Sequence, residues 1–117
     1  MADDFKTNRI RVAIASKGNT LESKISQQFC RCEYFVIYDT EFKSIEFIPN
    51  PYKDQTEGAG QAVAQLVISR NVNKIVSGDF GINIKSLLDS YKIQMIVLKD
   101  SEKKIKDIIE LLNNKKN

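Results

Sequence analysis

Two cysteines separated by one residue, Cys30 and Cys32, are the side chains of this sequence best suited to bind a metal. On an extended segment, side chains two residues apart point the same way, so both thiolates could contact one soft metal such as copper(I), zinc or cluster iron. Arg31 lies between them and could lower their pKa. Because two thiolates do not complete a tetrahedral site, a cluster, added sulfide or a second chain would supply the other ligands. The alternative is that both cysteines pack as small hydrophobic residues beside the core.

Glycines and basic residues mark the other candidate ligand contacts. The segment Gly58-Ala59-Gly60 opens a helical pattern, and the free N–H groups and dipole of a helix start favour an anion. The segment Gly78-Asp79-Phe80-Gly81 could leave room for a ligand beside the backbone or could form a tight turn. The candidate contacts other than the cysteines are Lys17, Arg31, Gly58, Gly60, Gly78 and Gly81.

Residues that would support catalysis are missing or scattered. The chain has no histidine, which removes imidazole catalysis and imidazole metal ligands. A two-metal nuclease needs several converging carboxylates, and the first predicted strand contains none. Asp39, Glu46 and Asp79 fall on separate elements, so we expect them not to converge. The sequence therefore predicts a protein that is not an enzyme.

Composition restricts the class of protein further. The 117 residues, 42% hydrophobic and 28% charged, suit one folded domain. The net charge is +3, but no long basic block interleaves with aromatic residues, so nucleic acid is not the expected partner. No apolar run approaches the length of a membrane span, and residues 1–9 lack the apolar core of a signal peptide. We therefore expect a cytoplasmic protein whose cysteines are reduced thiols.

Hydrophobic periodicity predicts eight elements in the order β-β-β-α-β-α-β-α. The predicted strands cover residues 10–15, 34–38, 45–48, 74–77 and 93–98; the predicted helices cover 59–67, 84–91 and 100–112. The continuous apolar run at 93–98 predicts a strand covered on both faces. Residues 20–28 could form a short helical turn, and Asp100 or Ser101 is the predicted N-cap of the last helix. Residues 1–9 are predicted as a flexible lead-in, 10–113 as one domain and 114–117 as a polar tail.

This order predicts an α/β fold in which a mixed five-stranded sheet packs against three main helices. The first three strands would form an antiparallel unit, and the last two would be added by right-handed parallel crossovers. Loops that follow parallel strands meet at one sheet edge, where ligands usually bind. If the second strand runs antiparallel to the first, the cysteine loop starts at that same edge. We therefore expect Cys30 and Cys32 in one exposed loop near Lys17 and the glycine turns.

Taken in order, these motifs resemble the dinitrogenase iron–molybdenum cofactor biosynthesis family, the small proteins related to NifX and to the C-terminal domain of NifB. The matching segments are Arg11-Val12-Ala13-Ile14-Ala15, Phe29-Cys30-Arg31-Cys32-Glu33-Tyr34-Phe35, Asn50-Pro51, Gly58-Ala59-Gly60-Gln61-Ala62 and Gly78-Asp79-Phe80-Gly81-Ile82-Asn83. The resemblance implies a ribonuclease H-like fold. It also implies non-enzymatic binding, storage or transfer of an anionic iron–molybdenum or related metal–sulfur cluster between donor and acceptor proteins. The alternatives are a regulatory docking domain without its own ligand and, as the weakest fit, a nuclease.

The sequence departs from this family at three positions. Cys30 stands where the family usually has glycine, Gln28 where histidine is common, and Ile82 where proline is usual. A binding mode that depends on histidine is therefore excluded for this chain. The close backbone approach that glycine permits is also lost at position 30, unless the thiol takes over that role.

Overall fold

The computed structural model describes residues 10–81 and 83–114. In chain order its elements are β1 (Arg11–Ser16), β2 (Tyr34–Asp39), β3 (Ser44–Pro49), α1 (Ala59–Ile68), β4 (Lys74–Ser77), α2 (Lys85–Ser90), β5 (Gln94–Val97) and α3 (Ile105–Asn114). This is the predicted order, and each strand lies within one or two residues of its prediction. The predicted lead-in at 1–9, position 82 and the tail residues 115–117 lie outside the described residues.

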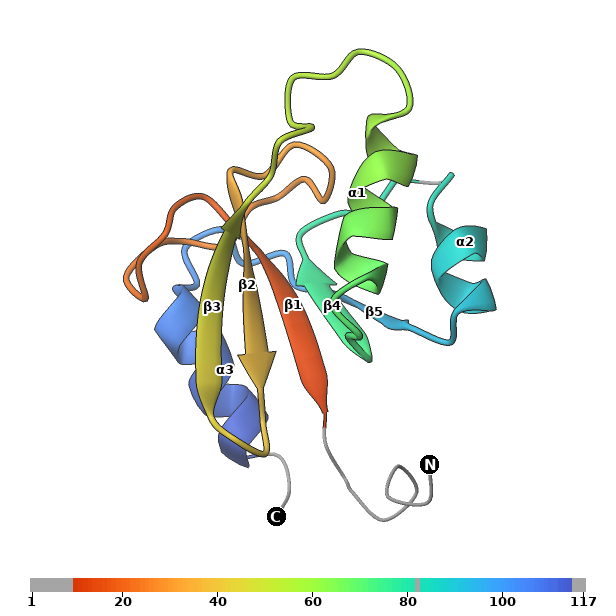
Figure 1. Ribbon diagram of the computed structural model, residues 1–117. Coiled ribbons are helices and arrows are strands. Elements are labelled where there is room, and N and C mark those ends of the chain that lie inside the picture. The colour runs from red at the N-terminus through yellow and green to blue at the C-terminus, as the bar shows by residue number, and fades with distance from the viewer. Residues whose placement is uncertain (1–9, 82, 115–117) are drawn as a thin grey trace, which may run out of the picture.

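The five strands form one mixed sheet in the order β3-β2-β1-β4-β5 (Figure 1). β1 pairs antiparallel with β2 and parallel with β4, so the first strand of the chain is the central one. β3 pairs antiparallel with β2, and β5 pairs parallel with β4. The predicted mixed five-stranded α/β fold is confirmed.

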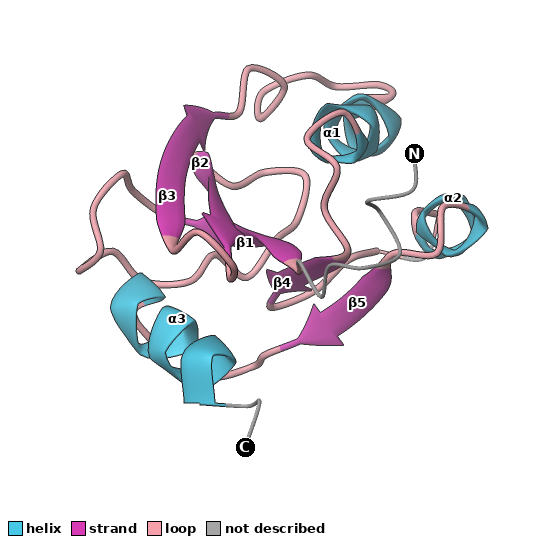
Figure 2. Cartoon of the chain, turned by 60° about the horizontal axis from the view of Figure 1, so that its bottom comes forward, coloured by secondary structure: helices cyan, strands magenta, loops and turns pink. Residues whose placement is uncertain are grey.

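Helices cover both faces of the sheet, with α1 and α2 on one face and α3 on the other (Figure 2). β1 is buried on both sides because its residues alternate between two cores. Ala13 and Ala15 belong to the core under α1, whereas Val12 and Ile14 belong to the core under α3. The inner face of α3 is apolar, and Ile105, Ile108 and Ile109 are buried there. No helix among the described residues is long and apolar enough to span a bilayer.

The expectation of a strand covered on both faces holds only for the middle of β5, where Met95 packs against the core under α1 and Ile96 against the core under α3. β5 is an edge strand, and Gln94 and Val97 are exposed, Val97 by 53%. A short apolar run does not by itself distinguish a central strand from an edge strand, which is why cover along the whole run was predicted.

Residues 20–28 contain no helix. The segment begins with a turn, in which the Ser23 N–H donates to Thr20 O at 3.1 Å, and continues with isolated bridges between Ser16 and Ile25 and between Lys24 and Lys104. Ile25 is fully buried in the core under α3. Burial of one isoleucine and pairing with two distant segments therefore outweigh a weak local helix preference.

α3 begins later than predicted, and neither Asp100 nor Ser101 is its N-cap. The carboxylate of Asp100 accepts the Glu102 N–H at 3.1 Å and closes a separate turn before the helix. The first N–H groups of α3, from Ile105 and Lys106, donate to the carbonyl oxygens of Ser23 and Leu21 at 2.8 and 2.9 Å. The backbone of the 20–25 segment thus satisfies the helix start, a long-range arrangement that local sequence does not reveal.

Candidate functional site

The loops gather at one edge of the sheet, as the topology predicts. β1, β3, β4 and β5 end there and β2 begins there, at the upper edge of the sheet in Figure 1. Three backbone hydrogen bonds connect separate loops: Glu33 N–H to Ser16 O at 3.2 Å, Gly78 N–H to Ser26 O at 3.1 Å and Phe29 N–H to Asp79 O at 3.1 Å. The cysteine loop is therefore held between the loops that follow β1 and β4.

Three buried serines, Ser16, Ser26 and Ser77, tighten these loops by the same device. Each hydroxyl donates to the carbonyl oxygen two residues on, at 2.7, 3.2 and 2.9 Å respectively. Each also accepts the N–H of that residue, at 3.2, 3.3 and 3.4 Å. Serine hydroxyls favour such turns. For Ser16 and Ser77 the sequence signal is a serine directly after an apolar run, whereas Ser26 has no such signal.

The two cysteines have different environments. Cys32 is 1% exposed and belongs to the core under α1, whereas Cys30 is partly buried. Burial raises the pKa of the Cys32 thiol to about 12, so this thiol is protonated at neutral pH. Residues 30 and 31 form a turn rather than an extended segment. The expectation that both cysteines lie in one exposed loop is therefore wrong for Cys32, and the expected lowering of thiol pKa by Arg31 is not found there.

The side chain of Asn50, which is far from residues 30 and 31 in sequence, fixes the turn that they form, here called the cysteine turn. This side chain is buried, and its Nδ2 donates to the carbonyl oxygens of Cys30 and Cys32 at 3.1 and 2.9 Å. Its Oδ1 accepts the Tyr52 N–H at 3.0 Å. One amide thus joins the cysteine turn to the start of the 50–58 loop. This bridging role was not predicted from the sequence.

Aromatic packing anchors the same turn from below. The ring of Phe29 is buried, and its centroid lies 5.5 Å from those of Phe35 and Phe80. Phe35 is on β2 and Phe80 follows β4, so Phe29 joins both strands immediately before Cys30. The position of the cysteine turn is therefore set by core packing on one side and by the Asn50 amide on the other.

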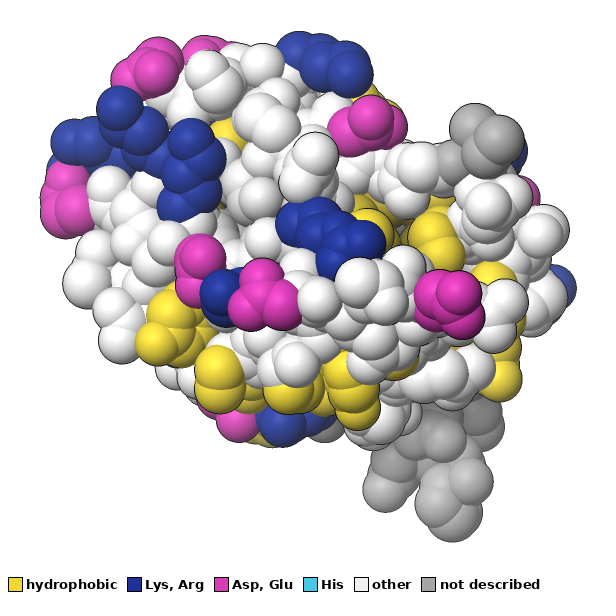
Figure 3. Space-filling view, turned by 90° about the horizontal axis from the view of Figure 1, so that it is seen from above, with side chains coloured by type: hydrophobic (Ala, Val, Ile, Leu, Met, Phe, Trp, Pro, Cys, Tyr) yellow, Lys and Arg dark blue, Asp and Glu magenta, His cyan; other side chains and the backbone are white. Residues whose placement is uncertain are grey.

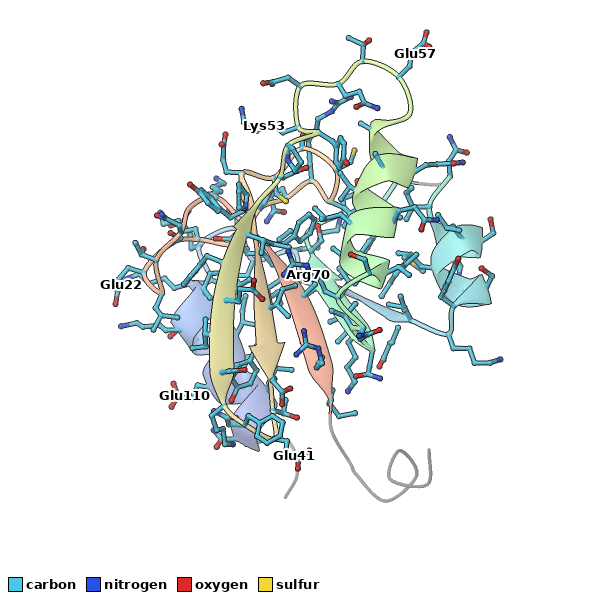
Figure 4. All side chains as sticks on the ribbon, in the orientation of Figure 1. Glu22, Glu41, Lys53, Glu57, Arg70 and Glu110 are labelled. Atoms are coloured by element: carbon cyan, nitrogen blue, oxygen red, sulfur yellow. The ribbon has the colours of Figure 1, made fainter. Side chains whose placement is uncertain are left out.

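Arg31 holds the 50–58 loop in place. Its Nη1 donates to the carbonyl oxygens of Lys53 and Gln55 at 2.8 and 2.6 Å, although the side chain is exposed. Figure 4 shows Lys53 and Glu57 on this loop, at the opposite end of the molecule from Glu41. The Nη1 group of the guanidinium thus has a structural role. Its remaining N–H groups and its charge are what it could offer to an anion.

The four predicted glycines differ in what they allow. Gly58 has φ +73° and is the N-cap of α1, a conformation that glycine adopts without strain. Gly60 follows it in the first turn of α1, and Gly81 is exposed. At Gly78 the space is already occupied, because an added Cβ would lie 2.6 Å from Cα of Gln27. Gly78 therefore fits the tight-turn alternative rather than room for a ligand.

Gln27, the residue that fills this space, was not singled out from the sequence. Its Nε2 is buried and has no hydrogen-bond partner among the described residues. Buried amide donors are normally paired, so this atom stands out within the loop edge. No pattern in the local sequence signals it.

At this edge, the start of α1 is where the positive end of a helix dipole is left without a cap. Gly58 offers no side-chain cap, and the first turn of α1 contains no acidic residue. Lys17 is exposed on the loop that follows β1, at the same edge. Seen onto this edge, basic side chains are spread over the surface with acidic ones between them (Figure 3). The edge thus offers an uncapped helix start and separate cations, not a continuous basic surface.

The carboxylates considered for a nuclease do not converge. Asp39 pairs with Arg11 at 3.3 Å where β1 begins, whereas Asp79 follows the end of β4 at the opposite edge. Glu46 lies on β3 and pairs with Arg70 at 2.9 Å. Among the described residues, no group of three His, Cys, Asp or Glu side chains is arranged to hold a metal. The expectation that these three carboxylates are scattered is confirmed.

The sequence profile of the dinitrogenase iron–molybdenum cofactor family matches residues 8–115, so the chain belongs to this family. Its fold is similar to that of the apo form of the orange protein from Desulfovibrio gigas, with a TM-score of 0.78, 20% identity, and coverage of 87% of this chain and 85% of that one. It is also similar to a NifB-like protein from Thermotoga, with a TM-score of 0.77, 29% identity, and coverage of 91% and 89%. A dinitrogenase-like protein from Methanocaldococcus jannaschii gives a TM-score of 0.60, 21% identity, and coverage of 92% and 88%. A search of curated proteins gives no match.

Family membership connects the chain to cofactor biosynthesis of the NifX type. Members of this family bind or carry the iron–molybdenum cofactor or a related cluster. The solved structures at 20% and 21% identity support the fold alone.

Proposed function

We propose that this protein binds an anionic metal–sulfur cluster of the iron–molybdenum type at the loop edge and passes it between donor and acceptor proteins without catalysing a reaction. The observation that carries this proposal is the uncapped start of α1, in a chain of the cofactor family. A helix start without a cap or an acidic residue favours a negative ligand. Lys17 and Arg31 are the basic side chains proposed to offset the charge of the cluster.

Of the two cysteines, Cys30 is the better candidate for a metal ligand in this proposal. Only a thiolate binds metal well, and Cys32 is buried with a pKa of about 12. Cys30 lies in the cysteine turn and is partly exposed. Cys32 would join it as a second ligand only if the turn at residues 30 and 31 opened. Gly58, Gly60 and Gly81 are proposed to present backbone to the cluster, while Gly78 shapes the turn after β4.

The test is anaerobic titration of the full chain with tetrathiomolybdate and, separately, with a preformed iron–sulfur cluster, followed by absorbance. We expect saturable uptake, and Cys30→Ser should weaken it at least about tenfold. Lys17→Gln should weaken it about threefold through loss of one nearby charge. Lys43→Gln is the matched control, because Lys43 lies on the β2–β3 turn at the other end of the sheet.

Two outcomes would contradict parts of this proposal. Equal uptake by wild type and Cys30→Ser would remove the thiolate and leave electrostatic binding alone. Absence of uptake by the wild type with either probe would overturn the carrier function. The double change of Cys30 and Cys32 is a poor test, because truncating the buried Cys32 also lowers stability.

A further inference from the structure

A closed circuit of hydrogen bonds begins and ends at Arg31. Arg31 Nη1 donates to the carbonyl oxygen of Gln55 at 2.6 Å, and the Gln55 N–H donates to Tyr52 O at 3.1 Å. The Tyr52 N–H donates to Asn50 Oδ1 at 3.0 Å. Asn50 Nδ2 then donates to the carbonyl oxygens of the two cysteines that flank Arg31, at 3.1 and 2.9 Å. The 50–58 loop therefore leads back to the residue that holds it.

The circuit is buried at one end and exposed at the other. Asn50 is 4% exposed, and its own N–H donates to Glu33 O at 3.0 Å. Tyr52 is partly buried against the core under α1. Arg31 and Gln55, in contrast, are exposed. The buried half thus fixes the path of the loop, and the loop in turn fixes an arginine at the surface.

Gln55 makes three of the bonds that give the loop its shape. Besides its two backbone bonds, to Arg31 and Tyr52, its side-chain Nε2 donates to Glu57 O at 2.7 Å. The same Nε2 lies 3.6 Å from the position that a Cβ would take at Gly58, so this side chain lies beside the start of α1. Gln55 therefore connects the arginine to the residues that lead into α1.

An arginine held in this way differs from a free arginine on the surface. The guanidinium is planar and carries five N–H donors in a fixed arrangement, so fixing Nη1 also fixes the directions of the N–H groups on Nε and Nη2. The two hydrogens of Nη1 have two acceptors, Lys53 O at 2.8 Å and Gln55 O. Ordering a long side chain before the ligand arrives removes an entropy cost from binding. The loop thus prepares the rest of the guanidinium for an anion.

We propose that Gln55 is a positioning residue for anion binding, which orients the Arg31 guanidinium through the 50–58 loop so that Nε and Nη2 contact the anion. This inference rests on the proposed function and adds to it a residue that touches no ligand. It requires the shape of the guanidinium and not only its charge. Arg31→Lys keeps the charge but leaves a single nitrogen, on a shorter side chain, for both the loop and the anion.

The test is titration of full-length Gln55→Ala and Arg31→Lys with tetrathiomolybdate, in low and in high salt. Relative to wild type, Gln55→Ala should weaken uptake about threefold and Arg31→Lys about tenfold in both conditions, because both lose side-chain order and neither loses a charge. The loss expected for Lys17→Gln is electrostatic and should shrink in high salt. Gln65→Ala is the matched control and should bind as wild type, since Gln65 is exposed in the second half of α1.

The combination of the two changes separates positioning from general damage. If Gln55 acts through Arg31, the double variant should bind no more weakly than Arg31→Lys alone. Losses that multiply, losses that vanish in high salt, or uptake by Gln55→Ala equal to that of wild type would each overturn this inference and leave the carrier function intact. Absence of uptake by the wild type would overturn both.

Proteolysis without added cluster reports the state of the loop independently. Glu57 and Glu41 are both exposed and lie at opposite ends of the molecule (Figure 4). In both variants, endoproteinase Glu-C should cleave after Glu57 about threefold faster, relative to cleavage after Glu41 in the same sample, because the loop opens locally. General destabilisation would accelerate both cleavages alike. A cleavage ratio equal to that of wild type would overturn the role of Gln55 in holding the loop.

Discussion

α1 and α3 are both ten-residue helices that begin at the same edge of the sheet, yet their N-terminal ends are treated in opposite ways. The start of α3 is closed by the carbonyl oxygens of Ser23 and Leu21 and carries Asp107 in its first turn. The start of α1 follows Gly58, without a side-chain cap or an acidic residue. The general affinity of helix starts for anions is thus cancelled at α3 and kept at α1.

Charged side chains strengthen the closure of the α3 start. Glu22 pairs with Lys104 and Lys106 at 3.0 and 3.1 Å, and Lys24 pairs with Glu102 at 2.6 Å. These pairs hold the 20–25 segment against the beginning of α3. The difference shows why charge and helix count alone do not locate a binding site: the partner of each helix start has to be known.

The largest expected effect on stability comes from weakening the closure of the α3 start. Ile105 is fully buried at the first position of α3, and Ile105→Ala should lower the free energy of unfolding by about 3 kcal/mol. Urea denaturation measures this loss. Hydrogen exchange should also accelerate at the Ile25 N–H, which donates to Lys103 O in the same closure. Leu111→Ala, at an exposed position of α3, should cost less than about 1 kcal/mol. Equal losses would show that the closure contributes nothing.

A smaller effect separates the two helix starts by charge. Gln61 is exposed in the first turn of α1, and Gln61→Glu should stabilise the helix by about 0.5 kcal/mol. The new carboxylate should also weaken uptake of tetrathiomolybdate about threefold by repulsion. The matched change at the other helix is Asp107→Asn, which should cost about 0.5 kcal/mol and leave uptake unchanged. If both variants changed uptake alike, the anion would not be located at α1.

The smallest effect concerns pH. Hydrogen bonds from Lys104 and Lys106 lower the pKa of Glu22 below its ordinary value of 4.5. A carboxyl whose pKa is lowered by folding adds stability above pH 4.5, and this contribution is lost as the pH falls below 4.5. Thermal unfolding of wild type and Glu22→Gln should therefore differ slightly at pH 7 and converge in acid. Because the side chain is exposed, high salt should also reduce the difference. A difference that persists in acid would exclude the ionic explanation.

The fold was largely predictable because apolar periodicity is a local property. Residues such as Ile14 and Ile75 belong to short apolar runs that read as buried strands, and the strand order follows from connection rules. The errors arise where the cover of a strand depends on its position in the sheet. The run at 93–98 was correctly predicted as a strand, but its edge position depends on the absence of a sixth strand in the described sheet.

The candidate site was predictable only in outline. Topology correctly brought the cysteine loop to the edge where Ser16 and Ser77 end their strands. The burial of Cys32 was not predictable, because it depends on a turn fixed by Asn50, 18 residues away in sequence. The two bonds from Arg31 to the 50–58 loop are likewise long-range. Spacing alone could not distinguish a pair of thiolates from one thiol in the core and one at the surface.

The central position of β1 has a consequence for how the chain folds. β1 to β3 form a meander of neighbouring segments, which close short loops and can pair early. Addition of β4 to the other side of β1 requires contacts such as the Arg11 N–H to Asn73 Oδ1 bond, which spans 62 residues. Closing so long a loop costs more entropy and delays the parallel half of the sheet. We therefore expect a nascent chain to form the meander first and to complete the loop edge only when β4 and β5 are added.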